Sequence, residues 1–124
     1  MSREISKEFQ PIFASAARTA TESATIICNR SSGLFFINVT AASATPSVVF
    51  TIAGLDPVGS TAYTILTSAA ITGTGLTVLR VSPHLTGSAN TIAKDLLPNA
   101  LKITATHADT DSITYSMSYI GVDT

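Results

Sequence analysis

The sequence has no tryptophan, one cysteine and two histidines among its 124 residues, and charged residues make up 12% of the chain. With Cys28 as the single thiol, no internal disulfide framework can form, and the composition is compatible with folding in a reducing cytoplasm. The charged share is about half of that in an average soluble domain. A net charge of −1 also lacks the basic excess of a general nucleic-acid binder, so we expect no nucleic-acid partner.

Two further absences concern membranes and export. No apolar run approaches the roughly 20 residues that a membrane helix requires. The N-terminal stretch MSREISKEFQPIF has mixed charge and no apolar centre, so it does not match a secretory signal. We therefore expect no membrane partner, and synthesis in a cytoplasm without export.

The chain also lacks a recognisable catalytic or metal-binding constellation. His84, His107 and Cys28 do not have the spacing of a zinc site, which needs three or four ligands. Asp109 and Asp111 alternate like the start of a calcium loop but lack its glycine and distal glutamate, so an Asx-type turn is the favoured interpretation. Serine is too abundant for a His–Asp–Ser match to be informative, and no nucleophile elbow is present. We expect no enzyme activity, no metal and no cofactor.

What the chain has in excess is uncharged surface. Apolar residues make up 45% of it, and serine and threonine supply about another quarter. Between Ser31 and Ala93 the only charged residues are Asp56 and Arg80. The mean hydropathy of +0.38 is high for a lone monomer, which normally avoids large apolar patches. This composition predicts extensive protein–protein contact.

Alternation with a period of two predicts β-strands along most of the chain. It is seen in residues 24–28, 48–53, 62–67, 76–81, 101–106 and 113–119, which are separated by turns rich in Gly, Pro and Asp. Leu34–Val39 is nearly all apolar, which predicts a strand covered on both faces. Thr91–Asn99 has no strand pattern and could hold one helical turn. About seven strands without a long helix predict a single all-β domain, an antiparallel β-sandwich or a barrel-like relative of it.

The first 22 residues differ from the rest, and we assign residues 1–22 as an extended N-terminal arm and residues 23–124 as the β-sandwich domain. Ser2–Phe9 could form a short helix with Ser2 as its N-cap, which Pro11 would interrupt. The segment contains four large apolar residues that need cover: Ile5, Phe9, Ile12 and Phe13. Two interpretations stay open, a frayed tail or an arm that docks on a neighbouring subunit.

Several phrases of the sequence together resemble a known family. In chain order they are NVTA (38–41), TPSVVF (45–50), GLDP (54–57), YTILTS (63–68), LP (97–98) and HAD with SITYS (107–116). This set resembles small β-rich virion proteins that are encoded among the structural genes of tailed bacteriophages. The similarity runs from about Arg18 to Ile120, nearly the whole of the predicted sandwich.

The resemblance implies a head decoration (cement) protein, a β-sandwich that binds the outer capsid surface and stabilises the shell. Its partners would be the major capsid protein and further copies of itself, for which we expect a trimer. The implied location is the virion, after synthesis in the bacterial cytoplasm, and the family brings no catalytic or cofactor residues. We expect the following residues at the capsid or subunit interface: Ile5, Phe9, Ile12, Phe13, Arg18, Leu55, Pro57, His84 and Leu85.

The alternative is a receptor- or glycan-binding module of a tail or head fibre. Such a module would use the loop at Asp56-Pro57 or the loop His84–Asn90. The absence of tryptophan disfavours a platform for sugar stacking. A small hydrolase is a third hypothesis, against which the missing constellation argues.

Overall fold

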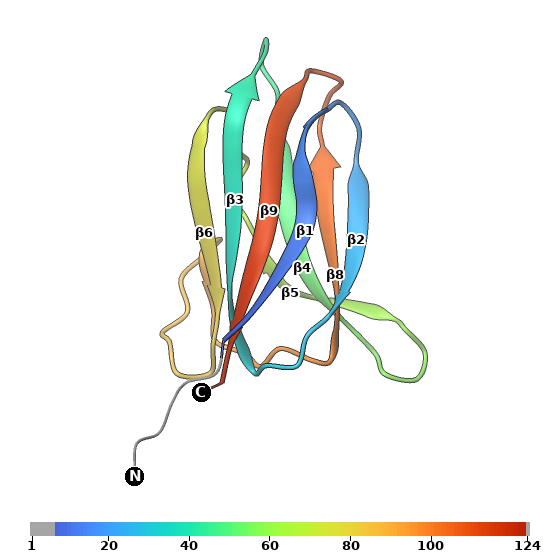
Figure 1. The fold of residues 1–124 in the computed structure, drawn as a ribbon, viewed down its shortest axis with the longest axis vertical. Coiled ribbons are helices and arrows are strands. Elements are labelled where there is room, and N and C mark those ends of the chain that lie inside the picture. The colour runs from blue at the N-terminus through green and yellow to red at the C-terminus, as the bar shows by residue number, and fades with distance from the viewer. Residues whose placement is uncertain (1–6, 124) are drawn as a thin grey trace.

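The computed structural model describes residues 7–123, and this part of the chain contains nine strands and no helix. The strands form two sheets that pack face to face, so the domain is an all-β sandwich (Figure 1). In chain order the strands are β1 (Lys7–Arg18), β2 (Glu22–Ile27), β3 (Ser32–Ala42), β4 (Val48–Leu55), β5 (Ala62–Thr67), β6 (Gly75–Val81), β7 (Ile92–Ala93), β8 (Ala100–His107) and β9 (Ile113–Val122).

One sheet has five strands in the order β1-β9-β3-β6-β7, and the other has four in the order β2-β8-β4-β5. Neighbouring strands run antiparallel, except that β6 and β7 pair in parallel. The seven strands that the sequence predicts are all present, and β1 and β7 are additional. The predicted β-sandwich is thus confirmed.

The N-terminal segment differs from the predicted arm. Lys7–Arg18 forms the edge strand β1, which pairs with β9 from Lys7 opposite Val122 to Arg18 opposite Ile113 (Figure 1). Pro11 is tolerated because an edge strand does not need every N–H for pairing. Register shifts on both sides of Phe13 interrupt the strict alternation, which is why the sequence pattern did not indicate a strand here.

Two segments in which the sequence allowed a helix contain strand residues instead. Lys7–Phe9, the end of the predicted short helix, belongs to β1, whereas Ile5 and the rest of that helix lie outside the described residues. In the stretch Thr91–Asn99, Ile92–Ala93 forms β7 beside Arg80 and Val81 instead of a helical turn.

The core lies between the sheets and is filled by the inward-facing residue of each alternation. Its fully buried large members are Phe35, Ile37, Val48, Phe50, Ile52, Leu79, Leu101, Ile103, Ile113, Tyr115, Met117 and Tyr119. Burying a side chain of this size contributes about 1.5–3 kcal/mol. Aromatic pairs add edge-to-face contact, as between Phe50 and Tyr115, whose ring centroids are 5.1 Å apart at 83°.

One end of the core is shaped by glycine. The Tyr119 ring lies over Gly33, where an added Cβ would come within 2.5 Å of the ring, and over Gly121 on its own strand. The Tyr119 hydroxyl lies 2.6 Å from the Cys28 sulfur. Burial and this contact raise the pKa of Tyr119 above its ordinary range. Cys28 is buried with it, so the single thiol serves as a packing partner in the core.

Candidate functional site

The outward-facing side of the five-stranded sheet is the most unusual surface of the domain. The register places Phe9, Ile120, Leu34 and Arg80 side by side in one row across β1, β9, β3 and β6. The next row contains Pro11, Ser118, Phe36 and Val78, and Leu76 follows beyond it. We call this surface the apolar face and define it by Phe9, Leu34, Phe36, Leu76, Val78, Ile120 and Val122.

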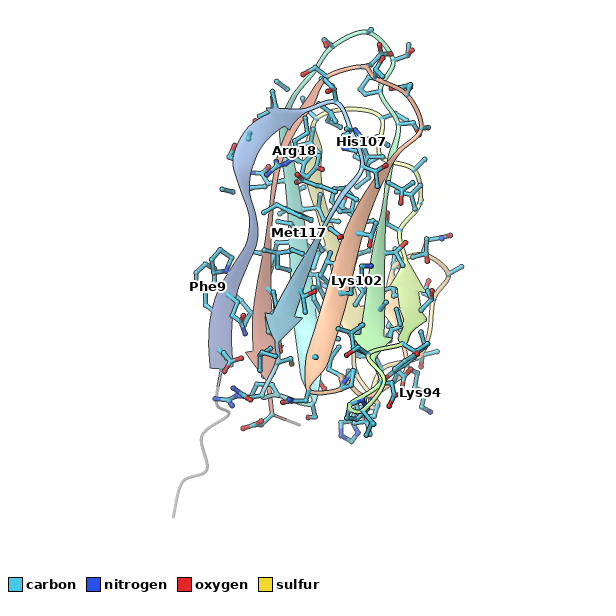
Figure 2. All side chains as sticks on the ribbon, turned by 90° about the vertical axis from the view of Figure 1, so that its right-hand side faces the viewer. Phe9, Arg18, Lys94, Lys102, His107 and Met117 are labelled. Atoms are coloured by element: carbon cyan, nitrogen blue, oxygen red, sulfur yellow. The ribbon has the colours of Figure 1, made fainter. Side chains whose placement is uncertain are left out.

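Part of the apolar face is exposed to solvent in the single chain. Phe9 and Leu76 are 67% and 63% exposed, and the other members are half-buried. Figure 2 shows Phe9 projecting outward from β1, away from the sandwich. Among the described residues, Lys7 and Arg80 are the charged residues at outward positions of this sheet, and no carboxylate shares them. A contiguous apolar surface without acidic residues is typical of a protein contact site.

The outward side of the four-stranded sheet has the opposite character. One row contains Ser23, Thr104, Thr51 and Thr67, and the row beside it contains Thr25, Lys102, Ala53 and Thr64. We call this surface the threonine face. Its larger apolar residues, Ile27, Val49 and Leu55, lie at its two ends, beyond these two rows. Hydroxyl groups are readily solvated, so this face needs no partner to be stable in water.

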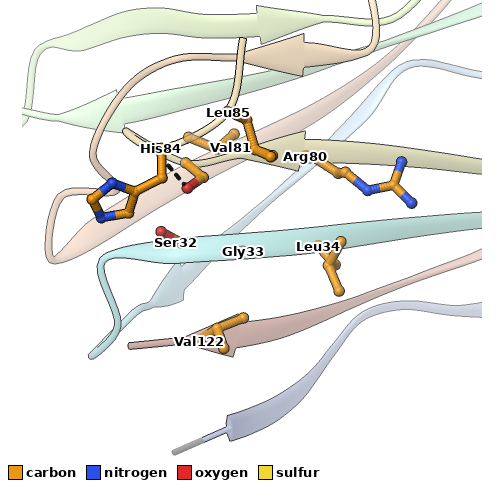
Figure 3. A pocket seen from close by; sticks show the side chains of 9 residues that line it. Ser32, Gly33, Leu34, Arg80, Val81, His84, Leu85 and Val122 are labelled. Carbon is orange, nitrogen blue, oxygen red and sulfur yellow. Dashed lines mark hydrogen bonds between the residues drawn. The ribbon is translucent and has the colours of Figure 1, made fainter. Parts of the chain in front are cut away.

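A pocket of about 350 Å3 opens at one end of the apolar face (Figure 3). Leu34 and Val122 line it from the sheet, while His84 and Leu85 line it from the segment that follows β6. That segment is held in place because the Ser82 hydroxyl accepts a hydrogen bond from the His84 N–H at 3.2 Å. The pocket is therefore built by the fold, and it includes two of the residues that the sequence analysis assigned to the interface.

Other predicted interface residues lie inside the sandwich. Phe13 is only 7% exposed and contacts the Tyr115 ring edge-on, and Ile12 packs partly buried against the core. Arg18 points inward, with its guanidinium 4.6 Å above the Tyr115 ring. Phe13 and Arg18 thus occupy inward positions of β1, opposite Met117 and Ile113, and within this chain they pack against the core.

Arg18 is the centre of a polar network that closes one end of the core. Its guanidinium donates hydrogen bonds to three backbone carbonyls, those of Ala14 at 2.6 Å, Ala16 at 3.1 Å and Tyr115 at 2.7 Å, and it forms an ion pair with Glu22. Burial, reinforced by the Glu22 carboxylate, raises the pKa of Tyr115 to about 12.

His107 completes this network from the other sheet. Its Nε2 lies 3.2 Å from the Tyr115 hydroxyl, and burial lowers the pKa of the imidazole. These groups contact one another inside the sandwich, and none lines the pocket on the apolar face. The network is therefore a structural closure of the sandwich.

Leu55, the last residue of β4, and Pro57, in the β4–β5 turn, do not join the apolar face. Leu55 is half-buried and Pro57 is exposed. The Asp56 carboxylate fixes the turn by accepting hydrogen bonds from the N–H groups of Val58 at 3.3 Å and Gly59 at 3.1 Å. The turn is thus a closed local structure.

The acidic turn at Asp109 and Asp111 matches the Asx interpretation. The Asp109 carboxylate accepts a hydrogen bond from the Asp111 N–H at 3.0 Å. The Asp111 carboxylate in turn accepts bonds from the N–H and hydroxyl of Thr45. Within residues 7–123, no three His, Cys, Asp or Glu side chains gather to form a possible metal site.

Comparisons with protein-family models, with curated proteins and with solved structures found no significant match to this chain. In the described part of the chain, no helix has the length and hydropathy to cross a membrane.

Sequence reasoning missed most of the apolar face. Of its members it selected only Phe9, together with His84 and Leu85 from the adjoining pocket, and not Leu34, Phe36 or the members on β6 and β9. The available indication was Leu34–Val39, whose apolar residues occupy both alternations. Cover on both faces was expected for this strand, whereas the structure covers one face with the core and leaves Leu34 and Phe36 half-buried on the other.

Proposed function

We propose that this protein is a bacteriophage head decoration protein that binds the outer capsid surface through the apolar face of its five-stranded sheet. The observation that carries the proposal is this face, on which Phe9 and Leu76 are exposed and, among residues 7–123, no acidic residue shares the outward positions. The resemblance of several sequence phrases to tailed-phage virion proteins supports the virion as the setting.

The physical requirements of a cement protein fit such a surface. A cement protein must bind many equivalent sites, and its affinity comes from burial of apolar surface, which contributes about 25 cal/mol per Å2. A standard interface buries about 800 Å2 on each partner. Central strands β3 and β9 hold the apolar face rigid, so little conformational entropy is lost when it docks. Copies of the chain would complete the contact area as a closed ring, for which we propose a trimer.

The direct test mixes the purified chain with phage heads that lack their decoration protein. We expect saturable binding, visible as co-sedimentation, and an increase in the temperature at which the heads release their DNA. A head preparation saturated with its own decoration protein is the control and should bind none of the added chain. The proposal is wrong if undecorated heads neither bind the chain nor gain heat resistance, and binding to host cells or to a glycan array would favour the fibre module instead.

A further inference from the structure

The pocket on the apolar face has an apolar floor and one cationic end. Leu34, Val122 and Leu85 line it, and Arg80 extends from its rim along β6 (Figure 3). The strand and the loop around it are tied together, since the backbone N–H of Arg80 donates to the Thr91 carbonyl at 2.9 Å and that of Ser82 to the Ala93 carbonyl at 3.0 Å. The pocket therefore exists before any partner arrives.

The Arg80 side chain makes no hydrogen bond or ion pair within residues 7–123. The cross-strand neighbour of Arg80 on β3 is Leu34, and on β7 it is Ile92. Asp123, the carboxylate that follows β9, lies 3.7 Å from the guanidinium of Arg30 instead. The exposed guanidinium of Arg80 is therefore available to pair with a carboxylate of a partner.

We propose that this pocket is the anchor point of the apolar face, and that it takes an apolar side chain that lies next to a carboxylate in a partner polypeptide. The apolar side chain fills the space between Leu34, Val122 and Leu85, and the carboxylate pairs with the Arg80 guanidinium. This inference rests on the proposed function, because it names the chemistry of the shell segment that the face would bind.

Both halves of such an anchor contribute to affinity by known means. A guanidinium binds a carboxylate through two parallel charge-assisted hydrogen bonds, which fix orientation as well as strength. An apolar side chain buried in a preformed pocket at the centre of a contact is the usual form of an interface hot spot, in which arginine is enriched. The other residues of the apolar face would then continue the contact on one side of the anchor and exclude water from that side.

The first experiment uses a minimal probe on the whole chain and needs no phage. N-acetyl-leucine carries an isobutyl group next to a carboxylate, N-acetyl-leucinamide lacks the charge, and N-acetylglycine lacks the side chain. We expect N-acetyl-leucine to shift the NMR methyl signals of Leu34, Leu85 and Val122 with saturation in the millimolar range, and each control to bind at least about tenfold more weakly. Equal binding of the amide, or no saturable binding of N-acetyl-leucine, would overturn the inference.

The second experiment tests the same site in the assembly. Arg80→Gln should bind undecorated heads at least about tenfold more weakly than the parent chain, whereas Lys102→Gln on the threonine face should bind them unchanged. If the parent chain binds heads and Arg80→Gln binds equally well, the anchor is wrong and the proposed function stands. If no variant binds heads, the proposed function fails, and the probe titration still decides the anchor. Concentration-dependent self-association that Arg80→Gln abolishes would overturn the inference in favour of a second copy of the chain.

Discussion

The two sheets of the sandwich share one core but have different outer faces. On the four-stranded sheet, a row of hydroxyl side chains runs across β2, β8, β4 and β5, with Thr104 and Thr51 at the centre. On the five-stranded sheet, the corresponding central positions are Phe36, Leu34 and Ile120. The same strand geometry therefore supports either a hydrated or an apolar surface.

This difference separates the needs of folding from those of binding. Threonine has a high β-propensity because its branched Cβ fits a pleated surface, and its hydroxyl keeps that surface soluble. The threonine face shows that this fold is built without large apolar side chains at the centre of an outer face. Phe36 and Leu34 are thus not required by the fold, and their exposure is better explained by contact with another protein.

The largest expected effect comes from a charge at the centre of the apolar face, and the same charge at the centre of the threonine face is its control. Phe36→Asp removes an aromatic contact and buries a carboxylate in any complex formed there. Attachment to undecorated heads should therefore weaken by at least about 30-fold, which corresponds to the loss of a hot spot worth about 2 kcal/mol. Thr104→Asp, at a central strand of the other sheet, should change attachment by less than about threefold. Quantitative co-sedimentation measures both.

A readout that is independent of phage heads sharpens this comparison. Phe36→Asp should lower the fluorescence of an apolar dye bound to the native chain, and Thr104→Asp should leave it unchanged. Circular dichroism and a urea unfolding curve establish that both variants are folded. If Thr104→Asp weakened attachment as much as Phe36→Asp, the two faces would not differ in the way proposed.

A smaller effect is expected where each sheet places a glycine beneath an aromatic ring. A Cβ at Gly33 would lie 2.5 Å from the Tyr119 ring and 3.0 Å from Leu97, and both side chains are buried. In the other sheet, a Cβ at Gly54 would meet the Tyr63 ring, but Tyr63 is 47% exposed and can move outward. Gly33→Ala should therefore lower the free energy of unfolding by about 1–3 kcal/mol, and Gly54→Ala by less than about 1 kcal/mol.

Urea unfolding with an unchanged m-value measures these stability differences. Gly73→Ala is the matched control, since a Cβ there would meet no heavy atom within 4 Å. It should leave stability within about 0.5 kcal/mol. Equal losses for Gly33→Ala and Gly54→Ala would show that the ring over Gly54 is held as firmly as the one over Gly33.

The sequence predicted the sandwich because six of its strands have clear alternation, a seventh is a short apolar run, and Gly, Pro and Asp turns separate them. It did not predict β1, whose alternation is broken by Pro11 and by bulges around Phe13, or β7, which has only two residues. The inward positions of Phe13 and Arg18 were not predictable either, because the two bulges decide which side chains of β1 face the core. The apolar face was not predictable as a surface, because it depends on the register between strands that are distant in the sequence.

The smallest expected effect concerns the interior between the faces, and it appears as a dependence of stability on pH. Burial lowers the pKa of His107 below its ordinary value of 6.5, so the unfolded chain takes up a proton first as the pH falls. The contribution of the neutral His107 side chain to the stability of the fold is therefore complete above about pH 6.5, and it is lost as the pH falls through the folded-state pKa. The pKa of Tyr115 is raised from 10 to about 12, and that of Tyr119 is raised as well, so the unfolded chain loses both protons first and stability declines as the pH rises above about 10.

Urea midpoints measured from pH 5.5 to 7.5 and from pH 9 to 11.5 would show both declines. His107→Gln should remove the one on the acid side, because glutamine keeps a polar group near the Tyr115 hydroxyl and does not titrate. Phe36→Asp and Thr104→Asp should show the alkaline decline of the parent chain, because neither outer face contacts the network of Arg18, Tyr115 and His107. A face variant that altered the alkaline decline would mean that the outer faces and the interior are coupled, and the two faces could then no longer be compared independently of the core.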